Sequence, residues 1–361
     1  MKKILLVIVV LFLLVFLAIL SPLILGLFLN DIEPFDDSDL TYAQETVIPQ
    51  DNAYFYLEKI EENLDVSKDE DEQLLVHLEE DAWDETFVEN ILAANENALT
   101  FFDAAAGKNA YQEPAYADLS GVTLESMLPT LTGLLAATRL NTLEALSLSK
   151  RGEEEAAFEE LFEALDLAQT LQSAQGTLIY QLLPISSKKV SLEALQRLAV
   201  DSALSSEKLS EYALRLENYS SVEGLIQGFK GEYFLDVWMV DFVANEGAQN
   251  LGMDTDPLLN RLAAFASGFY FHPNETKLRF ANYAREGIKN LQLSCEEEST
   301  LSEDLALLTA KPLYKLYLTP NAFGETLFVA SAVNADGARH QNCEYQDLLE
   351  ATKTALEAAS M

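Results

Sequence analysis

The stretch EEEAAFEELFEALDLAQTLQS at residues 153–173 predicts an amphipathic helix. Its apolar side chains recur every three or four residues and so share one face of a helix: Phe158, Leu161, Phe162, Leu165 and Ala168. Glu159, Glu160 and Glu163 fall on the opposite face. We interpret these three carboxylates as a solvated face.

The preceding segment predicts a second helix over residues 124–149, which is apolar on more than one side and should pack between neighbours. Arg151 and Gly152 make the link between the two helices. Because this link is too short for anything but a tight reversal, the helices should form an antiparallel hairpin.

Helical spacing dominates the rest of the chain. We predict further helices at 51–64, 83–105, 177–200, 205–218, 221–245, 257–270, 275–292 and 345–359. Clear strand alternation is absent, although Leu74–Leu78 and Leu316–Leu318 could be short extended pieces, and the pattern is weakest over 295–344. The predicted fold is all-α, with one elongated helical domain at 51–361.

The N-terminus predicts a membrane anchor over residues 1–29. After Met1-Lys2-Lys3, residues 4–29 form an apolar run broken only by Ser21, Pro22 and Gly26. As a helix this run would extend roughly 39 Å, more than the ~30 Å hydrocarbon core of a bilayer. A secretory signal would have a shorter apolar region and a small-residue cleavage site, which residues 28–31 lack. We therefore predict an uncleaved transmembrane helix.

The charges beside the anchor predict its orientation. Lys2 and Lys3 precede the apolar run, and the first basic residue after it is Lys59. Residues 30–50 contain two prolines and many acids, which indicates an acidic stalk. The positive-inside rule then places the N-terminus in the cytoplasm. We expect a single-pass protein of a bacterial inner membrane with its main domain in the periplasm.

The chain carries a formal net charge of −36. Such a surface repels nucleic acid and anionic lipid headgroups, so we expect no nucleic-acid partner. A halophilic or marine source would explain the acidity by solvation of the surface, and divalent cations or a basic partner protein are the alternatives. The acidic run Asp69–Glu72 lacks the glycine and the spaced bidentate acid of an EF-hand loop.

Cys295 and Cys343 are the two cysteines of the chain. In an exported domain an even pair favours a disulfide, because that compartment is oxidising. The alternative is a pair of free thiols.

Several residues of the predicted hairpin, which spans 124–173, resemble a tetratricopeptide repeat. Gly152 and the small and aliphatic residues after it match the second half of that pattern, and Ala145 stands where a small residue is expected in the first helix: Ala157, Leu161, Ala164, Leu165 and Leu167. The terminal proline of the pattern is replaced by Gln169. The resemblance implies closely packed helix pairs in a solenoid-like domain.

Other short motifs resemble a group of bacterial membrane-anchored helical proteins. They are Asp51-Asn52-Ala53, Thr177-Leu178-Ile179, Gly231-Glu232, and Pro320-Asn321 with Gly324. This resemblance implies an anchored helical architecture and supplies no activity.

Motifs for catalysis or metal binding are weak. The sequence contains no Walker A loop, GxGxxG, GxSxG, HExxH or CxxC. The S-x-x-K pattern occurs at Ser147, Ser186 and Ser205 without the companion motifs of a serine acyl-enzyme. The three histidines are far apart in sequence and give no support to zinc: His77, His272 and His340. We therefore predict no cofactor, no metal site and no enzyme activity.

Two charged residues lie within apolar helical stripes. Arg139 falls in the stripe of the 124–149 helix, and Glu232 in that of the 221–245 helix. Because an isolated buried charge costs several kcal/mol, we predict that Arg139 and Glu232 form a structural ion pair. The alternative is that Glu232, with Asp236 one turn later, is a general acid or base with a raised pKa.

Aromatic residues are dense in the helices from 221 to 271: Tyr233, Trp238, Phe242, Phe265, Phe269, Tyr270 and Phe271. Such side chains usually belong to a core. The alternative is an aromatic groove for a peptide, a lipid or a glycan.

Together these features favour a membrane-anchored extracytoplasmic scaffold, with residues 4–29 in the membrane and packed helical pairs that bind a protein partner. The alternatives are a binding module for a hydrophobic ligand or peptide, and an envelope enzyme that uses Glu232.

Overall fold

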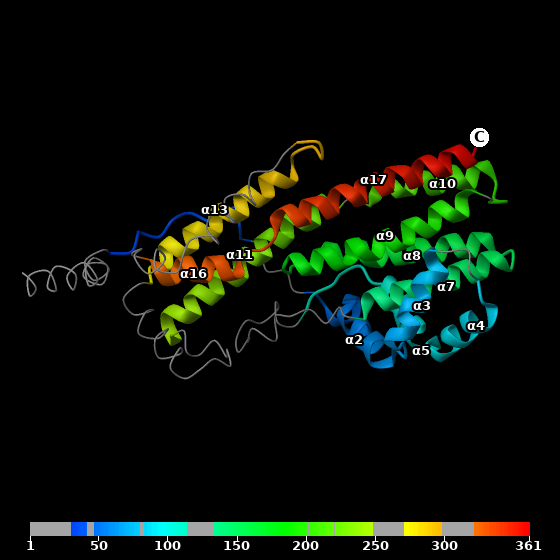
Figure 1. The fold of residues 1–361 in the computed structure, drawn as a ribbon, viewed down its shortest axis with the longest axis horizontal. Coiled ribbons are helices and arrows are strands. Elements are labelled where there is room, and N and C mark those ends of the chain that lie inside the picture. The colour runs from blue at the N-terminus through cyan, green and yellow to red at the C-terminus, as the bar shows by residue number, and fades with distance from the viewer. Residues whose placement is uncertain are drawn as a thin grey trace, which may run out of the picture. The chain divides into compact units, whose positions relative to one another are not determined.

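The computed structural model describes residues 30–41, 47–79, 83–113, 133–200, 202–219, 221–247, 271–297 and 321–361. Most of these residues are helical, and Figure 1 shows several long helices. Within the described ranges, extended pairing is limited to an isolated parallel bridge between Asn52 and Ala110. The predicted all-α class is confirmed.

The chain divides into two compact units, where the sequence suggests one helical domain. Unit 1 contains residues 1–42, 232–290 and 297–336, and unit 2 contains 43–231, 291–296 and 337–361. The helices α11 (Val222–Glu246) and α17 (Ala335–Ala359) contribute residues to both units.

Unit 2 begins with a 3₁₀ turn, η1 (Pro49–Asp51), and the helices α2 (Tyr54–Asn63), α3 (Lys68–Glu79), α4 (Glu85–Ala94) and α5 (Glu96–Ala106). Helix α3 contains Leu74–Leu78, so the suggestion of an extended piece there is wrong. The predicted helix at 83–105 is interrupted at Asn95. The buried Asn95 amide donates to the carbonyl of Ile91 and accepts from the N–H of Asp65, which holds the break between α4 and α5 in place.

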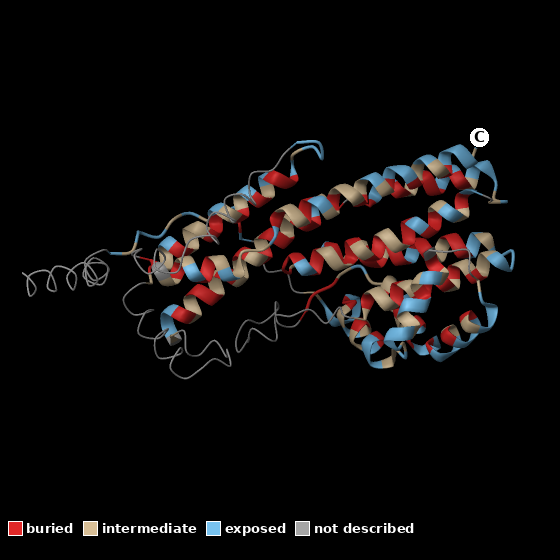
Figure 2. Ribbon diagram, viewed as in Figure 1, coloured by how far each residue is buried: buried red, intermediate tan, exposed pale blue. Residues whose placement is uncertain are grey.

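The centre of unit 2 is formed by α7 (Leu134–Lys150), α8 (Glu154–Gln172) and α9 (Leu178–Val200), which pack against one another. Figure 2 shows buried positions along all three helices. The reversal between α7 and α8 places Gly152 at φ +82°, a conformation that favours glycine. The predicted hairpin therefore forms, and the sequence stretch 153–173 matches α8 within one residue at each end.

Further helices of unit 2 cover this centre. They are α10 (Ser206–Arg215), the 3₁₀ turn η3 (Leu216–Asn218), residues 222–231 of α11 and residues 337–359 of α17. Gly231 lies so close to the carbonyl of Gly176 that an added Cβ would be 1.8 Å from that oxygen. Glycine at this position therefore allows α11 to approach the start of α9.

Unit 1 contains residues 232–246 of α11, residues 273–290 of α13 (Pro273–Leu291) and α16 (Ala322–Ser331). Its core includes Tyr233, Val240, Phe280 and Phe328, with Leu40 from the described segment 30–41. Neither α16 nor the first ten residues of α17 is predicted by the sequence, because they lie in the weakly patterned stretch 295–344.

Residues 30–41 are packed on unit 1, so the prediction of a stalk is wrong for this segment. Leu40 is 1% exposed. The carboxylate of Asp31 accepts from the N–H groups of Asn274 and Glu275 at 2.7 and 3.0 Å, and so caps the N-terminus of α13. Asp39 pairs with Arg285. The acidic residues here bind specific donors, which the composition of the segment does not reveal.

The predicted anchor at residues 4–29 lies outside the described residues. Among the helices that are described, none is both long enough and apolar enough to cross a membrane.

Cys295 and Cys343 form a disulfide in unit 2, as the sequence predicts, with Cα atoms 5.8 Å apart. The bond fixes the turn after α13 to α17. Close by, the guanidinium of Arg339 donates to the carbonyl of Ser294 across the same junction.

Replacement of both cysteines by serine should lower the free energy of unfolding by about 4 kcal/mol, because the closed loop spans 48 residues. Urea unfolding of the oxidised protein and the C295S/C343S variant measures this difference. The reduced wild-type protein is the control and should behave like the double variant. Equal stability of the oxidised and reduced proteins would contradict the expectation.

Candidate functional site

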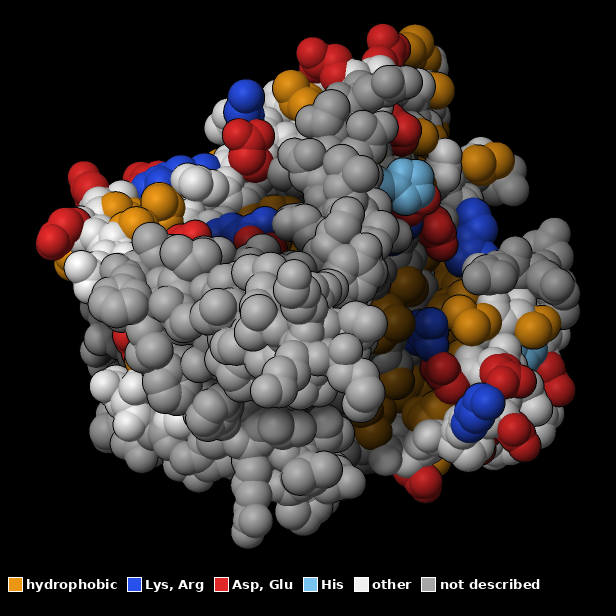
Figure 3. Space-filling view, turned by 60° about the vertical axis from the view of Figure 1, so that its left-hand side comes forward, with side chains coloured by type: hydrophobic (Ala, Val, Ile, Leu, Met, Phe, Trp, Pro, Cys, Tyr) orange, Lys and Arg blue, Asp and Glu red, His pale blue; other side chains and the backbone are white. Residues whose placement is uncertain are grey.

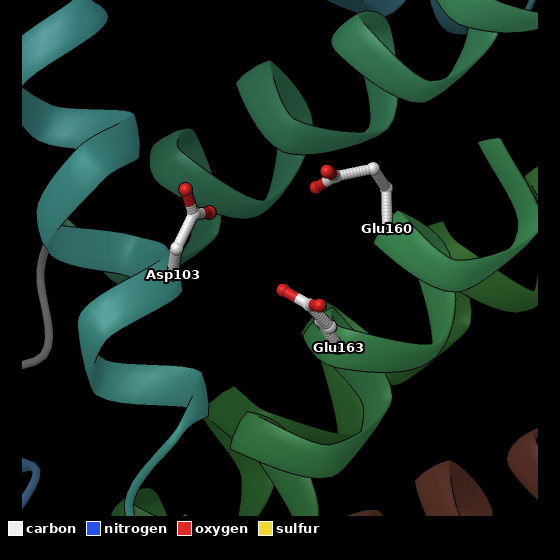
Figure 4. Close-up of side chains that lie close together, drawn as sticks. All are labelled: Asp103, Glu160 and Glu163. Carbon is white, nitrogen blue, oxygen red and sulfur yellow. The ribbon is translucent and has the colours of Figure 1, made fainter. Parts of the chain in front are cut away.

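Three carboxylates from two helices of unit 2 meet in one place. Asp103 belongs to α5, and Glu160 and Glu163 belong to α8. One oxygen from each group lies within 4.8 Å of the other two. Figure 4 shows the three side chains directed into the space between the two helices. We call these three residues the acidic cluster.

The acidic cluster forms because α5 packs against the polar side of α8. Glu160 and Glu163 are three residues apart and so lie on adjacent positions of that side. Glu160 is half-buried there, while Asp103 and Glu163 remain exposed. The interpretation of Glu159, Glu160 and Glu163 as one solvated face is therefore wrong for Glu159 and Glu160, which are both half-buried.

Helix α7 supplies two further polar groups. Asn141 is only 1% exposed, and its Nδ2 donates to Oε2 of Glu160 at 3.0 Å. Its Oδ1 is buried and has no hydrogen-bond partner. Glu144, one turn later, is half-buried, and the charge of Asp103 acts on it.

The electrostatics of the acidic cluster favour protonation. Burial, together with the charges of Asp103, Glu163 and Glu144, raises the pKa of Glu160 to about 7. Burial also raises the pKa values of Asp103, Glu144 and Glu163. Among the described residues, no lysine or arginine forms an ion pair with the acidic cluster.

The neighbouring Glu159 differs from Glu160 because it forms an ion pair. Arg215 of α10 binds Glu159 and Asp166, each at 2.8 Å. Although burial opposes it, the hydrogen bond from Arg215 lowers the pKa of Glu159. Arg215 therefore pairs with acids that lie before and after Glu160 in α8, but not with Glu160 itself. Elsewhere, Figure 3 shows acidic side chains on the coloured parts of one face, several of them beside lysine or arginine.

In protein treated with a chelator, the E160Q substitution should increase the free energy of unfolding more at pH 8 than at pH 4. Glu160 ionises near pH 7 in the folded state and near its ordinary ~4.3 in the unfolded state, so wild-type stability falls as pH rises through this window. We expect a difference on the order of 1–2 kcal/mol, measured by urea unfolding. E207Q, at an exposed position of α10, is the matched control and should change little.

A second polar centre surrounds Lys188 on α9. The Lys188 side chain is fully buried, and its Nζ donates to Oε1 of Gln169 at 2.5 Å and to Oε1 of Gln172. The ring of Tyr345 on α17 lies 5.5 Å from Nζ. Burial lowers the pKa of Lys188 to about 7. A neutral amine has two N–H donors, which match the two amide acceptors.

K188M should alter the pH dependence of stability. Between pH 7 and about 10.4 the unfolded chain holds a proton on Lys188 that the folded protein lacks, so wild-type stability rises with pH. Relative to K188M, the wild-type protein should gain on the order of 2–4 kcal/mol between pH 7 and 10 in urea unfolding. K189M is the matched control, because Lys189 lies near the surface and pairs with Glu344. Parallel curves for wild type and K188M would contradict this assignment.

The prediction that Arg139 pairs with Glu232 is wrong. Nη1 of Arg139 lies 2.6 and 2.7 Å from the two carboxylate oxygens of Asp71. Asp71 belongs to α3, a helix that the sequence analysis did not predict, and α3 packs against α7. The partner was therefore missed because its helix was missed.

Glu232 is half-buried in unit 1, and the neighbouring Asp236 is the more buried of the two. Burial and the charge of Glu232 raise the pKa of Asp236 well above its ordinary value, while a hydrogen bond from Ser331 lowers it. Burial therefore favours the protonated form of Asp236 more than it would for an exposed aspartate. The acid–base role suggested for Glu232 stays a prediction.

The predicted aromatic groups have different surroundings. Tyr233 is buried in the core of unit 1, and its hydroxyl donates to Asp37 at 2.5 Å. Trp238 and Phe242 are half-buried and stack with ring centroids 5.4 Å apart. The other predicted groove residues lie outside the described ranges: Phe265, Phe269 and Tyr270. Tyr233 and Trp238 thus contribute to the core rather than to an open surface.

The described residues define an all-α protein with two helical units, a disulfide and an acidic cluster at the junction of α5, α7 and α8. No protein-family model, curated protein or solved structure matches this chain.

Proposed function

We propose that this chain is a membrane-anchored, extracytoplasmic interaction protein that binds a protein partner through packed helical pairs. In this proposal residues 4–29 span a bacterial inner membrane, and the helical units lie in the periplasm.

The observation that carries the proposal is the close packing of α7, α8 and α9. Helices α7 and α8 pack against each other, and small residues of both helices are buried: Ala145, Ala157 and Ala164. These are positions at which the sequence resembles a tetratricopeptide repeat. Stacked helical pairs of this kind present extended surfaces to partner proteins, which supports an interaction role.

The disulfide supports the proposed compartment. Such bonds persist in oxidising environments and are rare in the reducing cytoplasm. The Cys295–Cys343 bond and the lysines before the apolar run independently favour the same side of the membrane for the helical units.

The test is crosslinking in cells, followed by purification of the tagged full-length protein in mild detergent. We expect a partner that is recovered in stoichiometric amount with the full chain and is absent when a tagged chain of residues 1–50 is purified in the same way. A partner recovered equally with both chains would bind residues 1–50 rather than the helical units. That outcome, or recovery of the full chain alone, would contradict the proposal.

A further inference from the structure

The Cys295–Cys343 disulfide lies at a place that solvent reaches. Cys295 is exposed in the turn after α13, and Cys343 is half-buried in the first half of α17. Disulfides that are exposed are more readily reduced than buried structural ones and are often regulatory. A thiolate in solution can therefore approach the Cys295 side of this bond in the folded protein.

The turn of α17 that contains Cys343 also binds other parts of unit 2. We call residues 342–346 the covering turn. Three of its side chains form polar contacts: Asn342 accepts from the hydroxyl of Ser221, Glu344 pairs with Lys189 of α9, and the hydroxyl of Tyr345 donates to the carbonyl of Tyr219. The position of the covering turn is therefore fixed both by these contacts and by the disulfide.

Lys188 of α9 is buried beside the covering turn. Its side chain is 0% exposed, and the ring of Tyr345, which is equally buried, lies 5.5 Å from Nζ. Gln169 and Gln172 of α8 accept hydrogen bonds from the same amine. Because Lys188 is fully buried, a reagent in water can reach the amine only when a neighbouring helix moves.

The disulfide is placed to prevent such a movement of α17. It holds Cys343, two residues before Tyr345, to the turn after α13. Without the bond this end of the loop is no longer fixed, and open arrangements gain conformational entropy. The end of α17 has contacts of its own, since Leu356 is fully buried and Oγ1 of Thr352 donates to the carbonyl of Leu192. Loss of the bond should therefore loosen the covering turn while the end of α17 stays packed.

We propose that the Cys295–Cys343 disulfide is a redox-active site, that a dithiol reduces it in the folded protein, and that reduction uncovers Lys188. One thiolate of the dithiol attacks Sγ of Cys295 and forms a mixed disulfide, and Cys343 leaves as a thiolate that takes up a proton. The second thiol loses its proton and attacks the reductant's sulfur in the mixed disulfide. Cys295 is then released as a thiol, and the dithiol has become a disulfide.

In sum, two electrons and two protons pass from the dithiol to the protein. The proposed site goes beyond the proposed interaction role and does not depend on it.

The first measurement tests reduction of the full-length protein in nonionic detergent at pH 8. Dithiothreitol, the probe dithiol, should release both thiols without denaturant, while circular dichroism shows that the helices remain. Alkylation followed by mass spectrometry counts the thiols. Release of the thiols only after urea is added would contradict the redox part of the proposal.

The second measurement is access to Lys188, determined by a short pulse of an amine-acylating reagent and mass spectrometry. After alkylation of the thiols, Lys188 in the reduced folded protein should be acylated about tenfold faster or more than in the oxidised protein. C295S/C343S should show the same fast acylation without a reductant. Lys68, whose side chain is 90% exposed, is the internal control and should react equally in all samples.

The oxidised L74A variant controls for a general loss of stability. Leu74 is fully buried in α3, so its truncation should destabilise unit 2 to a comparable degree with the disulfide intact. If the covering turn opens locally, Lys188 should still react faster in reduced wild type than in oxidised L74A.

Two results on Lys188 would overturn the proposal. Equal acylation in reduced and oxidised wild type would show that the disulfide does not control access to the amine. Equal acylation in reduced wild type and oxidised L74A would attribute the access to general destabilisation rather than to the covering turn.

Discussion

Helix α8 has to bury an apolar stripe along nearly its whole length, and the described parts of unit 2 are arranged around this requirement. Helices α7 and α9 pack along it, and α5 lies against its polar side. From α10, Tyr212 stacks on both Phe158 and Phe162, with ring centroids 5.0 and 5.2 Å apart. Burial of aromatic and aliphatic side chains at these contacts is the main source of free energy that holds the unit together.

Burial on so many sides forces polar groups of α8 into contact with other helices. Glu159 and Asp166 meet Arg215, which compensates for their loss of water. Gln169 and Gln172 accept hydrogen bonds from the amine of Lys188, so their amide oxygens have a donor and no carboxylate is involved. Glu160 meets Asn141 and further acids. The polar groups of this one helix thus have three kinds of partner, and around Glu160 like charges remain close together.

Regular helices with a clear period were predictable. The predicted helix at 153–173 is found at 154–172, because a long stripe of large apolar residues leaves one favourable conformation. The break at Asn95 was missed, because it depends on a side-chain contact with Asp65 from another part of the chain. Helix α3 was missed because it is acidic at its start and has a short apolar stretch, which resembles an extended piece.

The candidate site was predictable only in part. The spacing of Glu160 and Glu163 was visible in the sequence. Asp103 lies 57 residues before Glu160, and the residues around it do not indicate that it lies close to these two glutamates. The disulfide was predictable because two cysteines allow a single pairing. The partner of Arg139 was not, because the acidic chain offers many carboxylates and packing alone selects Asp71.

The sequence by itself determined the helical class, the α7–α8 hairpin and the excess of negative charge, because these follow from local spacing and composition. The tertiary structure decided which carboxylates find a cationic partner, that the acids of residues 30–41 bind donors in unit 1, and that Lys188 is buried. Those outcomes depend on which faces of distant helices come into contact. Such contacts are set by the shape of side chains across the whole interface, and no single segment contains that information.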